Sequence, residues 1–483
     1  MYILAIDQGT TGTTSILYDR AGRIAARAYC EITQHYPQPG WVEHDAMEIW
    51  QSVVATVEEL CSQHAGNIAA IGITNQRETT LLWNQHTGQP VYNAIVWQCR
   101  RTAEFCQQLQ DHTDFVRAHT GLPLDAYFSG TKIRWLLDNA GIDNADDLLF
   151  GTIDSWLIWR LTGGAVHATD YSNASRTLLF DIHERCWSKP LAELIGVPLS
   201  LLPEVRASIG DFGKVTSIPA LKGIPILGVA GDQQAALFGQ TCFQPGQTKN
   251  TYGTGGFVVM NTGQQAIQSK RGLLTTLAID GSGAPCYAME GSVFIAGAAL
   301  QWLRDELRLI TSATDSEMMA QAVDDNGGVY LVPAFVGLGT PHWNMQARAT
   351  LTGMTRGTNR NHIVRAALEA MAYQTNDVIG LMEQESGKNI ETLAVDGGAC
   401  ANNFLMQFQA DILDRPLIRP QIIESTSLGT AYMAGLAAGL WEDTDKLTQM
   451  KLTDAEFQPG MPSSQRQRYL QGWQHAVRQC LTD

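Results

Sequence analysis

Residues 2–18 read YILAIDQGTTGTTSILY: an apolar run ends at Asp7, a turn rich in glycine and threonine follows, and a second apolar run begins. Glycine in such a turn lets the backbone approach a ligand closely, while Thr10 and Thr11 offer N–H and hydroxyl donors to phosphate oxygens. Asp7 stands at the strand end, where a carboxylate can hold a hydrated cation. The stretch therefore predicts a hairpin that binds phosphate and magnesium. Taken alone, it is equally compatible with an ordinary hairpin.

The size and charge of the chain narrow its class. Its 483 residues exceed a single hydrophobic core, so we expect two or more domains. With 45% hydrophobic and 17% charged residues the composition is that of a globular protein. The formal net charge of −15 argues against nucleic acid or an anionic membrane as a partner, because both bind basic surfaces.

The cysteines and the hydropathy pattern predict the compartment. The nine cysteines are scattered, with no CxxC pair and no His/Cys cluster at zinc spacing, which is typical of reduced thiols. No basic leader precedes the first apolar run, and no stretch approaches the roughly 18 apolar residues of a membrane span. We expect a cytoplasmic protein that is not an integral membrane protein.

Strand and helix patterns alternate along the first half of the chain. Residues 68–73 and 79–83 are typical of strands on either side of a polar stretch. Residues 45–48 read DAME, a capping box that predicts the start of an amphipathic helix. A mixed α/β architecture follows from this alternation.

A second Gly/Thr turn opens the other half. A predicted strand at 248–252 leads into the turn at 253–256 and another apolar strand at 257–260. This order repeats that of the first hairpin, although the match is too short to prove a duplication. We place a domain boundary before this strand, which gives domains 1–245 and 246–483, each with a loop that faces phosphate.

A third Gly-rich junction lies near residue 397. The predicted strand 392–396 runs into Gly397-Gly398, and an amphipathic helix follows at 402–413. A strand, a glycine pair and a helix in this order suit the close approach of a nucleotide. A plain tight turn is the alternative.

Longer motifs carry a family resemblance. Residues 127–139 (YFSGTKIRWLLDN) and the stretch 349–369 resemble two patterns of the FGGY family of sugar and polyol kinases. Further runs are similar to the glycerol kinases within that family, and they lie at 39–45, 75–80, 94–102 and 230–240. The resemblance spans nearly the whole chain.

The resemblance implies both a fold and a reaction. The expected fold is α/β, with two ribonuclease-H-like (actin-like ATPase) domains flanking a catalytic cleft. The expected activity is ATP-dependent, in-line phosphorylation of glycerol to sn-glycerol 3-phosphate, with ATP and Mg²⁺ as cofactors and a homodimer or homotetramer as the assembly. Two alternatives stay open: an FGGY kinase for erythritol, xylulose or dihydroxyacetone, or a non-metabolic actin-like ATPase module.

The resemblance also implies the site residues. Asp232 is the implied catalytic base, although its place before an Ala-rich helix also suits a helix cap. On residue type alone, Arg77-Glu78 would be a solvated ion pair and the aromatic residues would belong to the core. The implied polyol ligands are Arg77, Glu78, Trp97, Tyr127, Asp232, Gln233 and Phe257. The implied nucleotide ligands are Thr10, Thr11, Thr254, Gly297, Gln301, Gly398 and Asn402, with Asp7 and Asp232 on the magnesium side.

Three departures from the resemblance stand out. Many glycerol kinases carry an arginine that reaches the nucleotide phosphates where this chain has Thr14. Residues 213–225 form a shorter loop that lacks the arginine of relatives inhibited by fructose 1,6-bisphosphate, so we expect no such inhibition. Asn344 stands where the family commonly has aspartate, and the sequence does not say what this changes.

Overall fold

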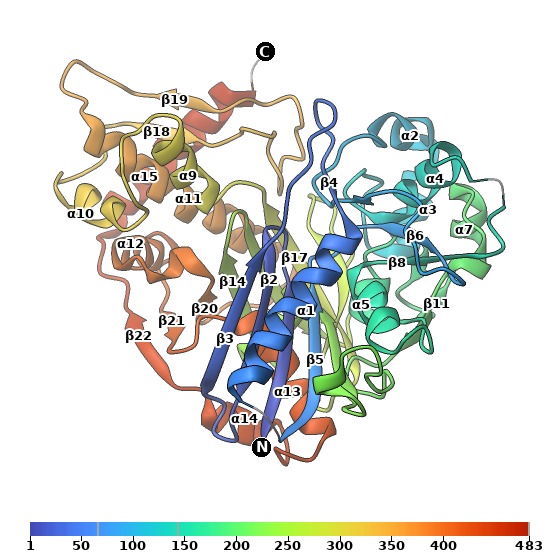
Figure 1. Ribbon diagram of the computed structural model, residues 1–483. Coiled ribbons are helices and arrows are strands. Elements are labelled where there is room, and N and C mark those ends of the chain that lie inside the picture. The colour runs from blue at the N-terminus through green and yellow to red at the C-terminus, as the bar shows by residue number, and fades with distance from the viewer. Residues whose placement is uncertain (65–66, 143, 482–483) are drawn as a thin grey trace.

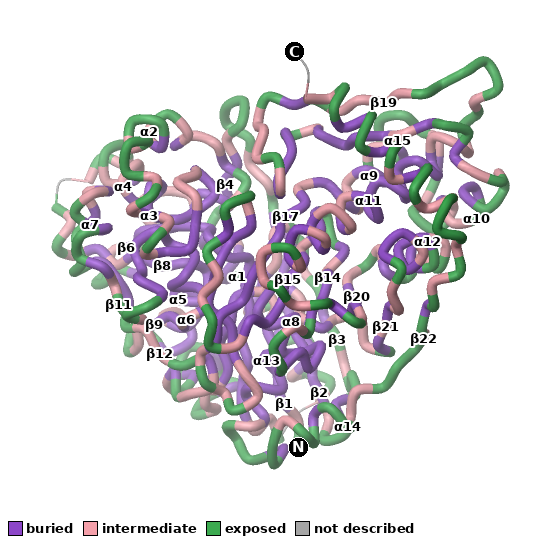
Figure 2. Tube along the Cα trace, turned by 180° about the vertical axis from the view of Figure 1, so that it is seen from behind, coloured by how far each residue is buried: buried purple, intermediate pink, exposed green. Residues whose placement is uncertain are grey.

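The molecule is built around two large sheets of five and seven strands (Figure 1). The computed structural model describes residues 1–64, 67–142 and 144–481. The N-terminus lies at the bottom of the view in Figure 1. Buried residues concentrate on the strands of both sheets (Figure 2).

The first sheet contains the hairpin predicted from residues 2–18. Strand β1 pairs antiparallel with β2, so that Asp7 lies opposite Thr14, and it pairs parallel with β5 on its other side. The sheet order is β13-β5-β1-β2-β3, formed by Ile226–Gly231, Ile68–Asn75, Tyr2–Gln8, Gly12–Tyr18 and Ile24–Glu31.

The second sheet repeats this arrangement. The hairpin of β14 and β15 has the antiparallel strand β17 on one side and the parallel strands β20 and β21 on the other. In the same way, the hairpin of β1 and β2 has the antiparallel strand β3 on one side and the parallel strands β5 and β13 on the other. Its order is β16-β17-β15-β14-β20-β21-β22, formed by Leu274–Ile279, Pro285–Val293, Gly256–Gly263, Thr248–Tyr252, Leu393–Asp396, Leu417–Pro420 and Thr453–Phe457. The expected pair of ribonuclease-H-like domains is confirmed, and the repeat suggested by the two turns extends over five strands.

Strand β1 is apolar on both faces because helices cover both. Leu4 and Ile6 pack with residues of α1 (Ala46–Gln63) and α5 (Ile153–Leu161). Ile3 and Ala5 point the other way, into a cluster with α8 (Asp232–Gly239) and α13 (Ser425–Ala437). A strand buried on both faces reads as a continuous apolar run, as residues 2–6 do.

Helices α8 and α13 cross very closely beside the cleft. A Cβ on Gly429 would lie 1.9 Å from the Ala235 carbonyl oxygen, and a Cβ on Gly239 would lie 2.1 Å from that of Ser425. Only glycine fits at these two contacts. Helix α13 comes from the second half of the chain yet packs on β1, β5 and β13 of the first sheet.

The capping box at residues 45–48 is half present. The Asp45 carboxylate caps α1 by accepting from the backbone N–H of Met47 at 2.7 Å. The reciprocal bond is absent between these described residues, because the Glu48 carboxylate accepts instead from the backbone and hydroxyl of Thr33. Part of the capping-box prediction was therefore wrong.

The remaining elements surround the two sheets. The first half contributes β4 Glu43–His44, β6 Leu81–Asn84, β7 Ala94–Ile95, α2 Ala103–Gln108, α3 Thr113–Thr120, α4 Ser129–Asn139, β8 Leu148–Gly151, β9 Ala168–Asp170, α6 Tyr171–Ala174, β10 Phe180–Asp181, β11 Cys186–Trp187, α7 Lys189–Ile195 and β12 Glu204–Arg206. Among those of the first half, α2, α4 and α7 lie on the right of Figure 1. The second half adds α9 Gly297–Asp305, α10 Asp315–Gln321, β18 Tyr330–Val332, β19 Thr350–Thr352, α11 Arg360–Ser386, α12 Asn403–Leu413, α14 Thr444–Met450 and α15 Ser463–Leu481. Across the described ranges, we find no helix with the length and apolarity needed to cross a membrane.

Candidate active site

A cavity of about 170 Å³ is lined by residues from both halves of the chain. Its walls come from the first hairpin turn, from the loop after β5, from the start of α8 and from the β14–β15 turn. It gathers every residue expected at the polyol site, together with three of the expected nucleotide residues: Thr10, Thr11, Arg77, Glu78, Trp97, Tyr127, Asp232, Gln233, Thr254 and Phe257.

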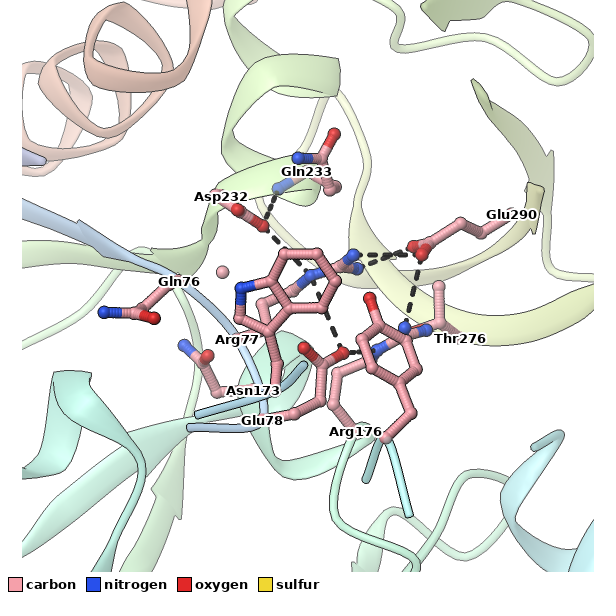
Figure 3. A network of polar contacts seen from close by, with 12 residues as sticks. Gln76, Arg77, Glu78, Asn173, Arg176, Asp232, Gln233, Thr276 and Glu290 are labelled. Atoms are coloured by element: carbon pink, nitrogen blue, oxygen red, sulfur yellow. Dashed lines mark hydrogen bonds and ion pairs between the residues drawn. The ribbon is translucent and has the colours of Figure 1, made fainter. Parts of the chain in front are cut away.

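Behind this cavity lies a buried network of alternating charges (Figure 3). The Arg77 guanidinium makes a two-pronged contact with the Glu290 carboxylate, with Nη1 and Nη2 at 2.6 and 2.9 Å from its oxygens. Its Nε lies 3.0 Å from Asp232 Oδ1. Arg176 joins the other side by donating to Glu78 at 2.6 Å and to Glu290 at 3.2 Å. The Arg77-Glu78 pair is therefore buried, and the solvated ion pair considered from sequence is wrong.

The pKa values follow from this burial and pairing. Burial raises the pKa of Glu290, but Arg176 and Arg77 outweigh it and hold the pKa at about 2. Burial raises the pKa of Glu78, although Arg176 and Arg77 oppose the rise. Glu290 is thus an ionised carboxylate that both guanidinium groups share.

Glu78 has a strained backbone that helix α4 holds in place. Its φ of 60° is in the left-handed region, which costs a residue with a side chain about 1–2 kcal/mol. The Glu78 carbonyl accepts from Lys132 Nζ and from Ser129 Oγ, both at 3.1 Å. The same ammonium donates to the Tyr127 carbonyl at 2.7 Å. Residues of the 127–139 motif therefore fix the backbone that carries two of the expected polyol ligands.

Three aromatic side chains form one wall of the cavity. The Trp97 ring meets the rings of Tyr127 and Phe257 edge to face, at centroid distances of 5.6 and 6.2 Å. The indole N–H of Trp97 donates to Thr10 Oγ1 at 2.9 Å. The three rings line the cavity, and Trp97 also packs against a hydrophobic core cluster beside it.

Asp232 is the carboxylate that opens toward the cavity. It is the first residue of α8 and Gly231 is the cap, so the helix-cap alternative is wrong. Its side chain is 29% exposed, whereas that of Glu78 is 2% exposed. Burial raises the pKa of Asp232, and Arg77 and Lys249 only partly oppose this rise. A carboxylate with a raised pKa is a better proton acceptor.

Asp7 and Asp232 together suit a divalent cation. Burial, followed by the negative charge of Asp232, raises the pKa of Asp7 to about 7, although the Arg27 guanidinium opposes the rise. The described ranges contain no group of three or more His, Cys, Asp or Glu side chains that could cage a metal. Magnesium is held through few carboxylates, waters and substrate phosphates, so this pair fits it.

A second cavity of about 320 Å³ continues from the first and shares Gly253 and Thr254 with it. It brings together the other expected nucleotide residues, Gly297, Gln301, Gly398 and Asn402. Apolar lining from Leu300 and from three alanines faces these polar groups. Such a cavity suits a flat base with polar edges.

Sequence reasoning missed three charged residues of the site: Arg176, Lys249 and Glu290. All three are completely buried. The sequence signal that could have found them is a single charged residue within an apolar or small-residue stretch, as in CYAMEGSV at 286–293. Such a stretch predicts burial, and a buried charged residue is expected to have a charged partner. Their partners lie far away in sequence, so the sequence did not show that they meet.

Two of the departures can be placed. Thr14 lies directly across the hairpin from Asp7, and such cross-strand neighbours share one face of a sheet. Asn344 is a turn residue whose Oδ1 accepts from the backbone N–H groups of Gln346 and Ala347 at 2.8 and 3.0 Å. Aspartate would make the same two bonds, so this departure leaves the turn intact.

Known proteins resemble the chain over its full length. Models of the FGGY family of carbohydrate kinases match residues 2–239 (N-terminal domain) and 248–438 (C-terminal domain). A glycerol kinase from Carboxydothermus hydrogenoformans is 56% identical, with 99% of this chain and 97% of the relative covered. Glycerol kinase 2 from Thermotoga maritima is 54% identical, with 99% of each chain covered. The crystal structure of Plasmodium falciparum glycerol kinase with ADP matches with a TM-score of 0.91 at 36% identity, covering 100% of this chain and 98% of that one.

Proposed function

The chain belongs to the FGGY family of carbohydrate kinases, and we propose that it phosphorylates glycerol with ATP to give sn-glycerol 3-phosphate. One observation carries the proposal: the cavity beside Asp232 combines charged groups and aromatic rings on a scale that suits a small polyol. The relatives named glycerol kinase support the same substrate.

The polyol is held by complementary groups on opposite sides. Its hydroxyls donate to the carboxylates of Glu78 and Asp232 and accept from Arg77 and Gln233, because a hydroxyl can do both at once. Its carbon backbone packs against Trp97 and Phe257. Tyr127 closes the same wall.

The nucleotide occupies the second cavity and reaches across to the first hairpin. Gln301 and Asn402 contact the nucleoside beside Gly297 and Gly398, and Thr254 continues to the phosphates. Thr10 and Thr11 donate to the phosphates from the opposite side. Asp7 and Asp232 hold Mg²⁺, which offsets the phosphate charge when it is bound.

The reaction is an in-line transfer. Asp232 takes the proton of the attacking hydroxyl while its oxygen forms a bond to the γ-phosphorus. The bond from that phosphorus to the β–γ bridging oxygen breaks, and ADP leaves. Most of the rate enhancement comes from positioning and charge neutralisation.

The direct test is an assay of the purified chain with ATP, Mg²⁺ and a panel of substrates. We expect glycerol 3-phosphate to form, with kcat/KM for glycerol at least about 5-fold above that for dihydroxyacetone, xylulose or erythritol, since a missed polar contact costs at least about 1 kcal/mol. A higher value for one of the other substrates would assign the chain to that kinase instead. ATP turnover that no polyol increases would favour an actin-like ATPase module.

Thr14 gives a second test, on the nucleotide side. We expect Thr14→Arg to lower the KM for ATP or to raise kcat by about 5-fold or more, because a guanidinium beside Asp7 adds a charged donor for phosphate. Thr14→Gln has a long side chain without the charge and should give no gain. Unchanged kinetics of the arginine variant would show that the chain does not lack this charge.

Four further properties belong to the same proposal. The chain works in the cytoplasm. It assembles as a homodimer or homotetramer, and light scattering of the purified protein will measure the mass of this assembly. The division into domains 1–245 and 246–483 stays a prediction. So does the expectation that fructose 1,6-bisphosphate does not inhibit.

A further inference from the structure

Lys249 lies inside β14 and is completely buried, yet the proposed reaction gives it no task. Its ammonium donates to Gln233 Oε1 and, at 2.7 Å, to Thr251 Oγ1. Four charged groups surround it from other elements: Asp396 on β20, Asp232 on α8, Glu290 on β17 and Arg77 in the loop after β5. Burial of an ammonium group costs free energy unless the group is paired and hydrogen-bonded. We therefore ask what the hydrogen bonds of this ammonium do for the site.

The contact with Gln233 fixes which way the amide points. An ammonium can only donate, so the amide atom that meets it must be the carbonyl oxygen. The NH₂ group of Gln233 is then turned away from Lys249. Gln233 lines the polyol cavity, and within the described ranges its Nε2 has no protein acceptor. The amide therefore offers hydrogen-bond donors to whatever fills the cavity.

Side-chain N–H donors are few in this cavity, whose other side-chain donors are hydroxyl groups such as that of Tyr127. Arg77 Nη1 donates to Glu290 and to Gln234, Nη2 donates to Glu290, and Nε is paired with Asp232. One N–H on Nη2 is left for a ligand. The carboxylates of Glu78 and Asp232 can only accept when they are ionised, so they offer no donor to the polyol oxygens. The amide of Gln233 is therefore one of the few N–H donors that the cavity offers to these oxygens.

We propose that Lys249 is a positioning residue that holds the Gln233 amide with its NH₂ group toward the polyol and so sets the donor pattern of the site. The inference rests on the proposed function. It names a determinant of substrate binding that acts through Gln233 and does not itself touch the substrate.

A double-mutant cycle with glycerol tests this role. We expect Lys249→Met and Gln233→Met each to lower kcat/KM for glycerol by about 5- to 100-fold, mainly through KM, because each removes the same oriented donor. The double variant should be no worse than either single variant. The KM for ATP should stay within about 2-fold, since the donor faces the polyol. Effects of the two changes that multiply in the double variant would overturn the inference.

Gln233→Glu tests the direction of the amide while Lys249 stays in place. One carboxylate oxygen would still accept from Lys249, but the other would present an acceptor where the NH₂ group was. We expect the KM for glycerol to rise by about 10-fold or more. An unchanged KM would contradict an oriented donor. This variant also keeps the inference testable if Lys249→Met does not fold.

A matched control comes from Lys451, whose ammonium donates to the Gln240 carbonyl at 2.7 Å outside the polyol cavity. Lys451→Met should leave the KM for glycerol unchanged, and a similar rise in this variant would overturn a role particular to Lys249. The outcomes also separate the two proposals. A wild-type protein that does not phosphorylate glycerol refutes the proposed function, whereas an active wild type with an additive cycle refutes only the role of Lys249.

Discussion

Asp232→Asn should lower kcat for glycerol phosphorylation by about 10²- to 10⁴-fold, the range that a positioned general base contributes. Asparagine keeps the size of the side chain, and its oxygen can still accept from Arg77 Nε, which lies 3.0 Å from Oδ1 in the wild type. What it loses is the ability to take the proton of the attacking hydroxyl. The measurement is steady-state formation of glycerol 3-phosphate, with glycerol binding followed separately by calorimetry.

Asp377→Asn is the control for this variant. Asp377 is a half-buried carboxyl group that accepts from the Trp473 indole at 2.7 Å, away from both cavities of the site. We expect its kcat to match the wild type. Equal activity of Asp232→Asn and wild type would remove Asp232 from the role of base. A large loss of glycerol binding in Asp232→Asn would instead show that its main contribution is to hold the substrate.

Glu290→Gln should destabilise the protein by about 3–5 kcal/mol, because removing one partner of a buried ion pair leaves charge uncompensated. Glu290 is completely buried and faces both Arg77 and Arg176. Its pKa of about 2, against an ordinary 4.5, corresponds to about 3 kcal/mol of stabilisation by these neighbours. Urea unfolding at pH 7 measures the loss.

The pH dependence of this variant has a defined direction. A carboxyl group whose folded pKa is lowered stabilises the protein above its unfolded pKa and loses this effect as the pH falls toward its folded pKa. The stability difference between wild type and Glu290→Gln should therefore be complete at pH 7 and shrink from about pH 4.5 toward pH 2. A difference that does not change over this window would contradict the charge-pairing role.

The control for Glu290 is an exposed pair. Lys189 and Glu193 lie one helical turn apart at 3.6 Å, with side chains 73% and 67% exposed. Solvent screens such a pair, so Glu193→Gln should leave the unfolding midpoint unchanged within error. A loss as large as that of Glu290→Gln would mean that any loss of a glutamate charge destabilises the protein, irrespective of burial.

Local sequence determined the parts of the fold whose causes are local. The apolar run at 2–6 and the glycines that follow it specify a buried strand and a tight hairpin, and the same pattern recurs at 248–260. Periodicity placed α1 and α12, and turn chemistry placed the Gly397-Gly398 junction. Motif resemblance added residues of both cavities, since family motifs record positions together with the residues that occupy them.

Tertiary structure alone decided which charges meet. Glu290 and Arg77 are separated by 213 positions and Arg176 and Glu78 by 98, so neither pattern nor spacing could reveal the pairs. Folding brings together charged residues such as Glu290 and Arg176 that are isolated in the sequence, and it buries them. Because an unpaired buried charge costs free energy, each of them is paired with a residue of opposite charge. The sequence by itself determined the two hairpins and the candidate residues around them. Only the packing of the two halves of the chain against each other decided that Arg77 pairs with Glu290 and that Gln233 is oriented by Lys249, because low-dielectric burial and contact geometry exist only in the folded chain.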